Sequence, residues 1–163
     1  LRPPLDLDVI RPHLLECSYA RHYGRYIELA REHEARLVLC NFNMAVTQAS
    51  PPEVVEFYEL GFPNVHMCID ANRINSELVH AVAEGHAHVS VADVQDGLNG
   101  HHEGNYVDLV HMTYEGKARL AENVLRAITP LVETDLERSP GRYQPVRRVS
   151  AKVPVEEIGI RVR

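Results

Sequence analysis

The sequence predicts an α/β fold in which a parallel β-sheet is covered by helices. Apolar residues recur at helical spacing in several segments, and these segments alternate with short, continuous apolar runs. Such runs are typical of parallel strands, because helices cover both faces of a parallel sheet. With 163 residues, of which 45% are apolar, the chain is long enough to build one core of this kind.

The first expected element is a helix over residues 12–36, and Pro12 fits its first turn. Its apolar stripe is expected to contain Leu15, Tyr19, Tyr23, Tyr26 and Ala30. A buried strand is expected directly afterwards, over residues 37–40. Asn41 and Asn43 follow at its carboxyl end, the edge at which open α/β sheets bind ligands.

The middle of the chain predicts two helices with a short extended segment between them. Ser50 is expected to cap a helix that ends at Gly61, and Glu53 completes a capping box with this serine. Residues 65–69 are predicted to be extended and apolar, and residues 71–84 to be helical. The buried face of this second helix is expected to carry Ile74, Leu78 and Val82.

A second strand is expected over residues 88–92, because apolar and small residues alternate there. A loop rich in Gly, Asn and His follows over residues 97–106. Thr113 is expected to cap a last helix, which Pro130 ends. The apolar positions of that helix are Ala118, Ala121, Leu125 and Ile128.

Charge divides the chain into an acidic body and a basic tail. Residues 1–137 carry 10 basic and 21 acidic side chains, whereas residues 138–163 carry 7 basic and 2 acidic ones. Residues 1–137 are therefore assigned to the α/β domain and residues 138–163 to an extended tail. An acidic body of this kind does not favour a nucleic-acid partner.

Two further features bear on location. The sequence has no apolar run long enough for a membrane span, and no signal peptide is recognisable. The three cysteines are scattered, which argues against a disulfide framework and mildly favours a reducing, cytoplasmic compartment.

Asp108 and His111 stand in the loop between the last expected strand and the last expected helix. In a serine esterase, an imidazole accepts the proton of the attacking hydroxyl, and a carboxylate holds the other ring nitrogen. Two intervening residues allow one short loop to present both side chains. Asp108 is therefore the candidate orienting acid, and His111 the candidate general base.

Residues 108–116 read Asp-Leu-Val-His-Met-Thr-Tyr-Glu-Gly, and Ala118, Leu120, Ala121 and Val124 follow them. This stretch resembles the final conserved block of the SGNH hydrolases, which are also called GDSL esterases/lipases. The resemblance implies a three-layer α/β/α, flavodoxin-like fold. It also implies hydrolysis of a carboxylic ester through an acyl-enzyme, without a cofactor. The substrate would be an acetyl or short acyl ester of a carbohydrate or a lipid.

The nucleophile of that family lies in a Gly-Asp-Ser motif, and an oxyanion donor lies in a Gly-x-Asn-Asp motif. Neither motif occurs in these 163 residues, and Asn41 and Asn43 lack the flanking residues of the second. The chain begins with Leu rather than Met, so we expect it to be processed or part of something longer. It is then the C-terminal part of such a domain, completed by an N-terminal half or a partner chain, and a homo-oligomer is one possibility.

Two other interpretations remain open at this point. A metal-dependent hydrolase would draw its ligands from His86, His88, Asp93, His101, His102, Asp108 and His111. His101, His102 and Glu103 could instead rim the mouth of a substrate site. The second alternative is a non-catalytic α/β binding module that descends from a hydrolase.

Overall fold

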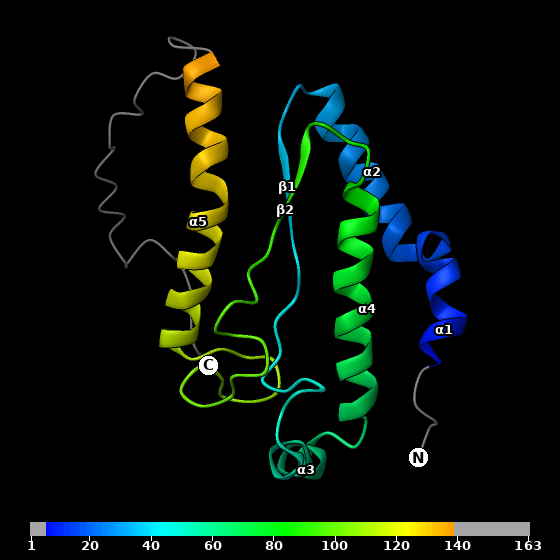
Figure 1. Cartoon of the computed structure of the whole chain (residues 1–163), viewed down its shortest axis with the longest axis vertical. Helices are drawn as coiled ribbons and strands as arrows, with labels where there is room; N and C mark the ends of the chain where they lie inside the picture. The colour runs from blue at the N-terminus through cyan, green and yellow to red at the C-terminus, as the bar shows by residue number, and fades with distance from the viewer. Residues whose placement is uncertain (1–5, 139–163) are drawn as a thin grey trace, which may run out of the picture. The chain divides into compact units, whose positions relative to one another are not determined.

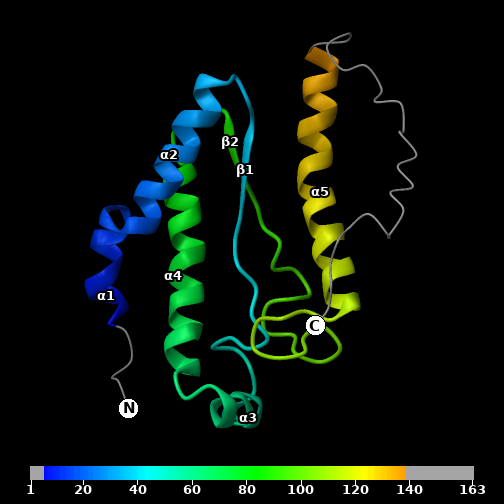
Figure 2. The same ribbon diagram turned by 180° about the vertical axis from the view of Figure 1, so that it is seen from behind.

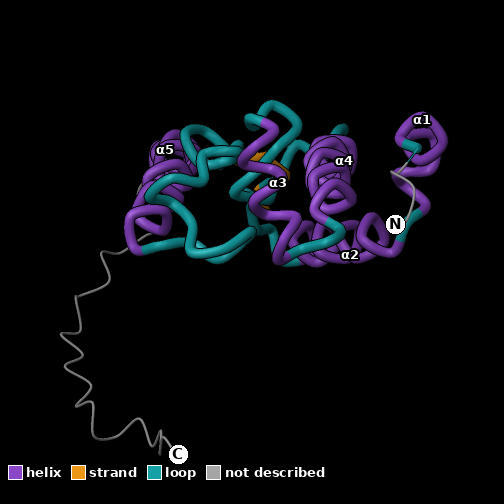
Figure 3. Tube along the Cα trace, turned by 90° about the horizontal axis from the view of Figure 1, so that it is seen from below, coloured by secondary structure: helices purple, strands orange, loops and turns teal. Residues whose placement is uncertain are grey.

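The computed structural model describes residues 6–138, which contain helices and one small sheet (Figure 1). Their order is α1 (Leu7–Ile10), a 3-10 turn (Arg11–Glu16), α2 (Ser18–Glu32), β1 (Leu37–Cys40), α3 (Pro52–Gly61), α4 (Val65–Ala83), β2 (Val89–Ala92) and α5 (Tyr114–Arg138). The strands are short, and the rest of the described chain is helix or loop (Figure 3). The chain divides into two units after Pro130. No helix among residues 6–138 has the length and apolar character needed to cross a membrane.

The two strands are parallel, as the sequence predicts, and the described residues thus have an α/β architecture. Leu37 pairs with Val89, and Cys40 pairs with Ala92 at the carboxyl end. The order helix–strand–helix–strand–helix brings the ends of both strands to the same edge of the sheet. Within residues 6–138 the sheet has two strands.

Two apolar clusters hold this unit together. Helices α2 and α4 lie side by side (Figures 1 and 2) and pack with the sheet. That cluster centres on Ile27, Leu39 and Val79. The second cluster joins the loop after β1 to α3, α4 and the loop before α5, with Val46 and Leu109 among its buried members. The second cluster therefore supports the loop that carries Asp108 and His111.

The prediction of one helix over residues 12–36 is wrong. The helical structure begins earlier, at Leu7, where the Asp6 carboxylate caps α1. The helical structure is interrupted at Cys17, whose backbone is extended with ψ 164°. Cys17 is the N-cap of α2, which begins at Ser18. Tyr19 and Tyr26, expected in the buried stripe, are 67% and 59% exposed.

The prediction of an extended segment over residues 65–69 is also wrong, because α4 runs unbroken from Val65. Val65, Ile69 and Asn72 are all buried. Their spacing of four and three residues is that of one helical face. Because Asn72 is polar, the spacing of apolar residues alone does not reveal this helical period.

Ser50 does not cap α3. Its hydroxyl accepts a hydrogen bond from the backbone N–H of Thr47 at 2.9 Å, which closes the turn before the helix. Pro51 takes the cap position, and no side chain caps the helix there. The helix ends at Gly61 as predicted.

Helix α5 begins as predicted, since the Thr113 hydroxyl accepts a hydrogen bond from the N–H of Gly116 at 3.0 Å. Pro130 does not end it, because the helix continues to Arg138. Leu125, expected on the packed face, is 57% exposed, whereas Gly116 and Asn123 are buried. Of the predicted basic tail, only Arg138 lies within the described residues.

Gly116 is expected to be the position at which one added methyl group damages the fold most. A Cβ there would overlap the backbone carbonyl of Asn105, which cannot rotate away. Gly116→Ala should therefore lower the free energy of unfolding by about 3 kcal/mol. Gly24→Ala in α2 is the matched control, because nothing lies near its Cβ and alanine favours helix by about 1 kcal/mol. Urea unfolding of both variants measures the difference, and equal stabilities would contradict this packing.

Candidate active site

Asp108 and His111 lie on a narrow turn immediately before α5. The N–H of Val107 donates to the carbonyl of His111 at 2.8 Å, and Tyr106 forms an antiparallel bridge with Met112. These backbone bonds close the turn at its base. The two candidate side chains are therefore presented by one short, closed loop.

Leu109 anchors this turn to the rest of the unit. Its side chain is 3% exposed and belongs to the cluster beneath the loop. Its carbonyl accepts a hydrogen bond from the N–H of Ala45 at 2.9 Å, in the loop after β1. An apolar residue between Asp108 and His111 thus fixes the turn to the carboxyl edge of the sheet.

The structure brings the two predicted side chains into direct contact. The Nδ1–H of His111 donates to Oδ2 of Asp108 at 2.7 Å. The other carboxylate oxygen, Oδ1, accepts the backbone N–H groups of His111 at 2.8 Å and Val110 at 3.0 Å. Asp108 thereby fixes both the ring orientation and the tautomer of His111.

The opposite ring nitrogen is the one that could exchange a proton with another group. The His111 side chain is 78% exposed, compared with 37% for Asp108. Among residues 6–138, no group forms a hydrogen bond with Nε2 of His111. An imidazole held at Nδ1 and open at Nε2 has the arrangement of a general base.

The surrounding donors lower the pKa of Asp108 to about 2. The backbone N–H of His111 contributes most, followed by the N–H of Val110 and the ring of His111. All three interactions favour the charged carboxylate over the protonated acid. Asp108 is therefore ionised throughout the neutral range.

We expect the stabilising effect of ionised Asp108 to persist well below neutral pH. A carboxyl group with a lowered pKa stabilises the fold above its ordinary pKa of about 3.9. That contribution is lost as the pH falls through the folded value of about 2. Carboxyl ¹³C NMR should give a midpoint of about 2 for Asp108. A midpoint near the ordinary value would show that the three donors do not hold the carboxylate in solution.

Two tyrosines beside the turn were not identified from the sequence. Tyr58 of α3 is buried, and its ring lies edge-on to His102 with 6.4 Å between the ring centroids. Burial raises the pKa of Tyr58, and the negative charge of Asp108 raises it further. Burial also raises the pKa of Tyr106 to about 12. Val55 and Tyr58 are three residues apart on one face of α3, and this spacing is the sequence signal that could have predicted a buried tyrosine beside the turn.

Both asparagines that follow β1 are buried. The Asn41 amide donates to Asp93 at 3.0 Å and accepts from the N–H of Val94 at 3.0 Å, which ties the ends of both strands together. The hydrogen bond from the Asn41 amide is the largest cause of the lowered pKa of Asp93. Asn43 is buried, and its Oδ1 has no hydrogen-bond partner in the described chain. Asn41 is therefore a structural clamp, and its amide is not free to hold an oxyanion.

The histidines of the metal alternative do not converge. Within residues 6–138, no three His, Cys, Asp or Glu side chains are grouped as a metal ion requires. His86 and His88 pack against each other, and His88 bonds the carbonyl of Ile27 at 3.0 Å. His102 packs on Tyr58 instead, and His101 and Glu103 are exposed.

A serine partner for His111 is absent from the described residues. Ser50 bonds the N–H of Thr47, and Ser76 bonds the carbonyl of Asn72. Neither of these serines, nor Ser18 or Ser90, forms a hydrogen bond with His111. Comparison of the chain with protein-family models, curated proteins and solved structures finds no match.

Proposed function

We propose that this chain supplies the orienting acid and the general base of a serine-type ester hydrolase of the SGNH class. One observation carries the proposal: the 2.7 Å bond between His111 Nδ1 and Asp108, with the rest of the ring exposed. The position of this pair at the carboxyl edge of a parallel sheet supports it, because ligands bind there in α/β folds. The chain would then form the C-terminal part of a three-layer, flavodoxin-like domain.

In the proposed reaction, Nε2 of His111 accepts the proton of a serine hydroxyl from outside these 163 residues. The serine oxygen attacks the ester carbonyl, and the protonated ring then gives its proton to the leaving alcohol. In the second step, His111 removes a proton from water while the water oxygen attacks the acyl carbonyl. The protonated ring then gives this proton to the serine oxygen, and the acid and the free serine are released. Asp108 stabilises the imidazolium in both steps. The substrate would be an acetyl or short acyl ester of a carbohydrate or lipid.

Two surfaces of the described chain are left uncovered, and they support the proposal of a further segment that packs on them. β1 pairs with β2 along one edge, and no strand among residues 6–138 pairs with its other edge. The expected apolar residues Tyr19, Tyr26 and Leu125 are exposed. A segment that adds a strand beside β1 would pair this edge of the sheet, and it would also bury the exposed apolar side chains. We propose that this segment, an N-terminal half or a partner chain, carries the serine and the oxyanion donors.

The test uses the whole polypeptide or complex that contains these residues, with p-nitrophenyl acetate as substrate. We expect hydrolysis that a chelator such as EDTA does not reduce. Loss of hydrolysis with EDTA would instead favour the metal-dependent alternative. Absence of hydrolysis for acetyl and butyryl esters would overturn the proposal and favour a binding module.

A further inference from the structure

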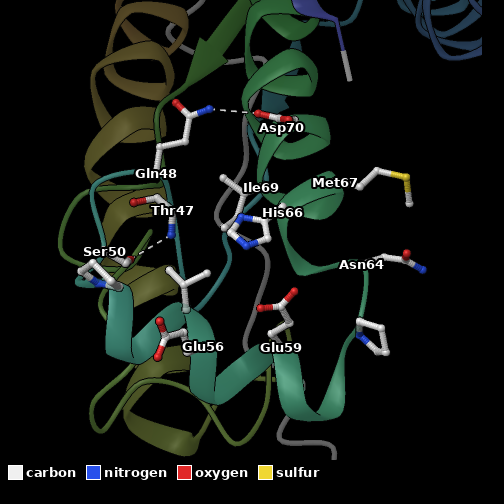
Figure 4. Close-up of a pocket in the computed structure, with 13 residues that line it drawn as sticks. Thr47, Gln48, Ser50, Glu56, Glu59, Asn64, His66, Met67, Ile69 and Asp70 are labelled. Carbon is white, nitrogen blue, oxygen red and sulfur yellow. Dashed lines mark hydrogen bonds between the residues drawn. The ribbon is translucent and has the colours of Figure 1, made fainter. Parts of the chain in front are cut away.

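Helix α3 presents two different faces to the rest of the described chain. Its carboxylates Glu56 and Glu59 line a pocket of about 700 Å³ on the side of α4 (Figure 4). Tyr58 lies about 200° around the helix from Glu56 and does not line this pocket. Its side chain belongs instead to the apolar cluster beneath the turn that carries Asp108 and His111. Tyr58 is therefore part of the surroundings of the candidate active site.

Tyr58 and His111 both lie near Tyr106, and this places the two side chains close to each other. Tyr58 and Tyr106 are buried members of the same cluster. Tyr106 forms the antiparallel bridge with Met112 that closes the turn, and His111 is the residue directly before Met112. One residue of extended chain advances the backbone by about 3.3 Å. The Tyr58 side chain therefore lies beside the base of the turn, within reach of a substrate that is bound at the imidazole.

Two tyrosine hydroxyls near the turn have no hydrogen-bond partner among residues 6–138, and they differ in access. The hydroxyl of Tyr106 is fully enclosed, whereas that of Tyr58 keeps accessible surface although the residue is only 8% exposed. Burial raises the pKa of Tyr58, and the charge of Asp108 raises it further, so this hydroxyl keeps its proton at neutral pH. A buried ring thus holds an uncharged hydrogen-bond donor at the surface of the site.

Two further rings surround this hydroxyl-bearing side chain. The ring of His102 lies edge-on to Tyr58, with 6.4 Å between the centroids, and within the described chain its nitrogens have no hydrogen-bond partner. The ring of Phe57 is also edge-on to Tyr58, at 5.4 Å, and this residue is 68% exposed. Small-molecule sites combine apolar surface with a few placed polar groups in this way.

We propose that Tyr58, His102 and Phe57 form an alcohol subsite, which binds a sugar as the alcohol part of the ester substrate. A sugar offers hydroxyl groups to Tyr58 and His102, and its C–H face can lie on the ring of Phe57. An alkyl alcohol would cover the same polar groups without pairing them, which costs free energy. The subsite therefore favours carbohydrate esters over esters of alkyl alcohols. This inference rests on the proposed ester hydrolysis.

A pair of acetates tests the subsite in the whole polypeptide or complex that contains these residues. One is a monoacetate of methyl glucoside, and the other is cyclohexylmethyl acetate, which has a similar ring without hydroxyls. We expect a higher kcat/KM for the sugar ester, and Tyr58→Phe should reduce this preference about tenfold. The phenylalanine ring keeps the packing, so the change measures the loss of the hydroxyl. Tyr23→Phe, in a half-buried tyrosine of the other apolar cluster, should leave the preference unchanged.

Binding of methyl glucoside, followed by NMR, separates this inference from the proposed reaction. The glucoside has no ester bond, so its binding requires no serine and no hydrolysis. We expect saturable shifts of the ring signals of Tyr58 and His102, and weaker binding by Tyr58→Phe. Such shifts without hydrolysis of either acetate would overturn the proposed reaction but not the subsite. Absence of these shifts, or an equal preference of parent and Tyr58→Phe between the two acetates, would overturn the subsite.

Discussion

Replacing His111 by alanine is expected to reduce ester hydrolysis by a factor on the order of 10⁴ or more. The imidazole is the group on the turn that can accept the serine proton, because the pKa of Asp108 is lowered to about 2 and its carboxylate is therefore a very weak base. The fold should survive, because the His111 side chain is 78% exposed and packs against little. The turn itself keeps its backbone bonds and the buried Leu109.

His22→Ala is the matched control for this variant. His22 is an exposed histidine of α2 to which no role in the site is assigned. Steady-state hydrolysis of p-nitrophenyl acetate and thermal unfolding should be measured for both variants. Comparable activity of His111→Ala and His22→Ala would remove His111 from the chemistry.

Asp108→Asn is expected to reduce hydrolysis by a factor on the order of 10⁴ while leaving the turn closed. The asparagine oxygen can still accept the two backbone N–H groups that Oδ1 accepts in the parent. The amide nitrogen would then face Nδ1 of His111, and it can only donate. His111 would be forced to carry its proton on Nε2, the nitrogen that must accept the proton of the serine.

The loss of activity in Asp108→Asn should coincide with a change of tautomer. ¹⁵N NMR of the ring should show the proton on Nδ1 in the parent and on Nε2 in the variant. Asp96→Asn is the control, because Asp96 pairs with Arg126 on the surface and not with a histidine. Full activity of Asp108→Asn, or an unchanged tautomer, would show that Asp108 does not orient the base.

The sequence was most informative where the determining contacts are local. Both strands are short apolar runs flanked by helices, and their parallel pairing follows from that order. The spacing of Asp108 and His111 is also local, and it suffices to put a carboxylate beside an imidazole on one turn. The Thr113 cap depends on a residue only three positions away.

The sequence was less informative where tertiary contacts decide. Cys17 interrupts the helix that the tyrosine spacing predicts to be continuous. Tyr23 packs against the apolar cluster, whereas Tyr19 and Tyr26 remain exposed because the packed face carries Ala20 and Ile27. The aromatic contact of Tyr58 with His102 joins α3 to a distant loop, so no short pattern encodes it. Residues 6–138 contain a parallel sheet of two strands, so the three-layer arrangement that the resemblance implies stays a prediction.

The most direct measurement is the site of covalent modification by a fluorophosphonate in the whole polypeptide or complex. Such probes phosphonylate a serine whose hydroxyl is activated by a neighbouring histidine. Peptide mapping should locate the adduct on one serine outside these 163 residues, and His111→Ala should prevent its formation. An adduct on a serine within the chain, or one that forms as fast without His111, would contradict the proposed division of the active site.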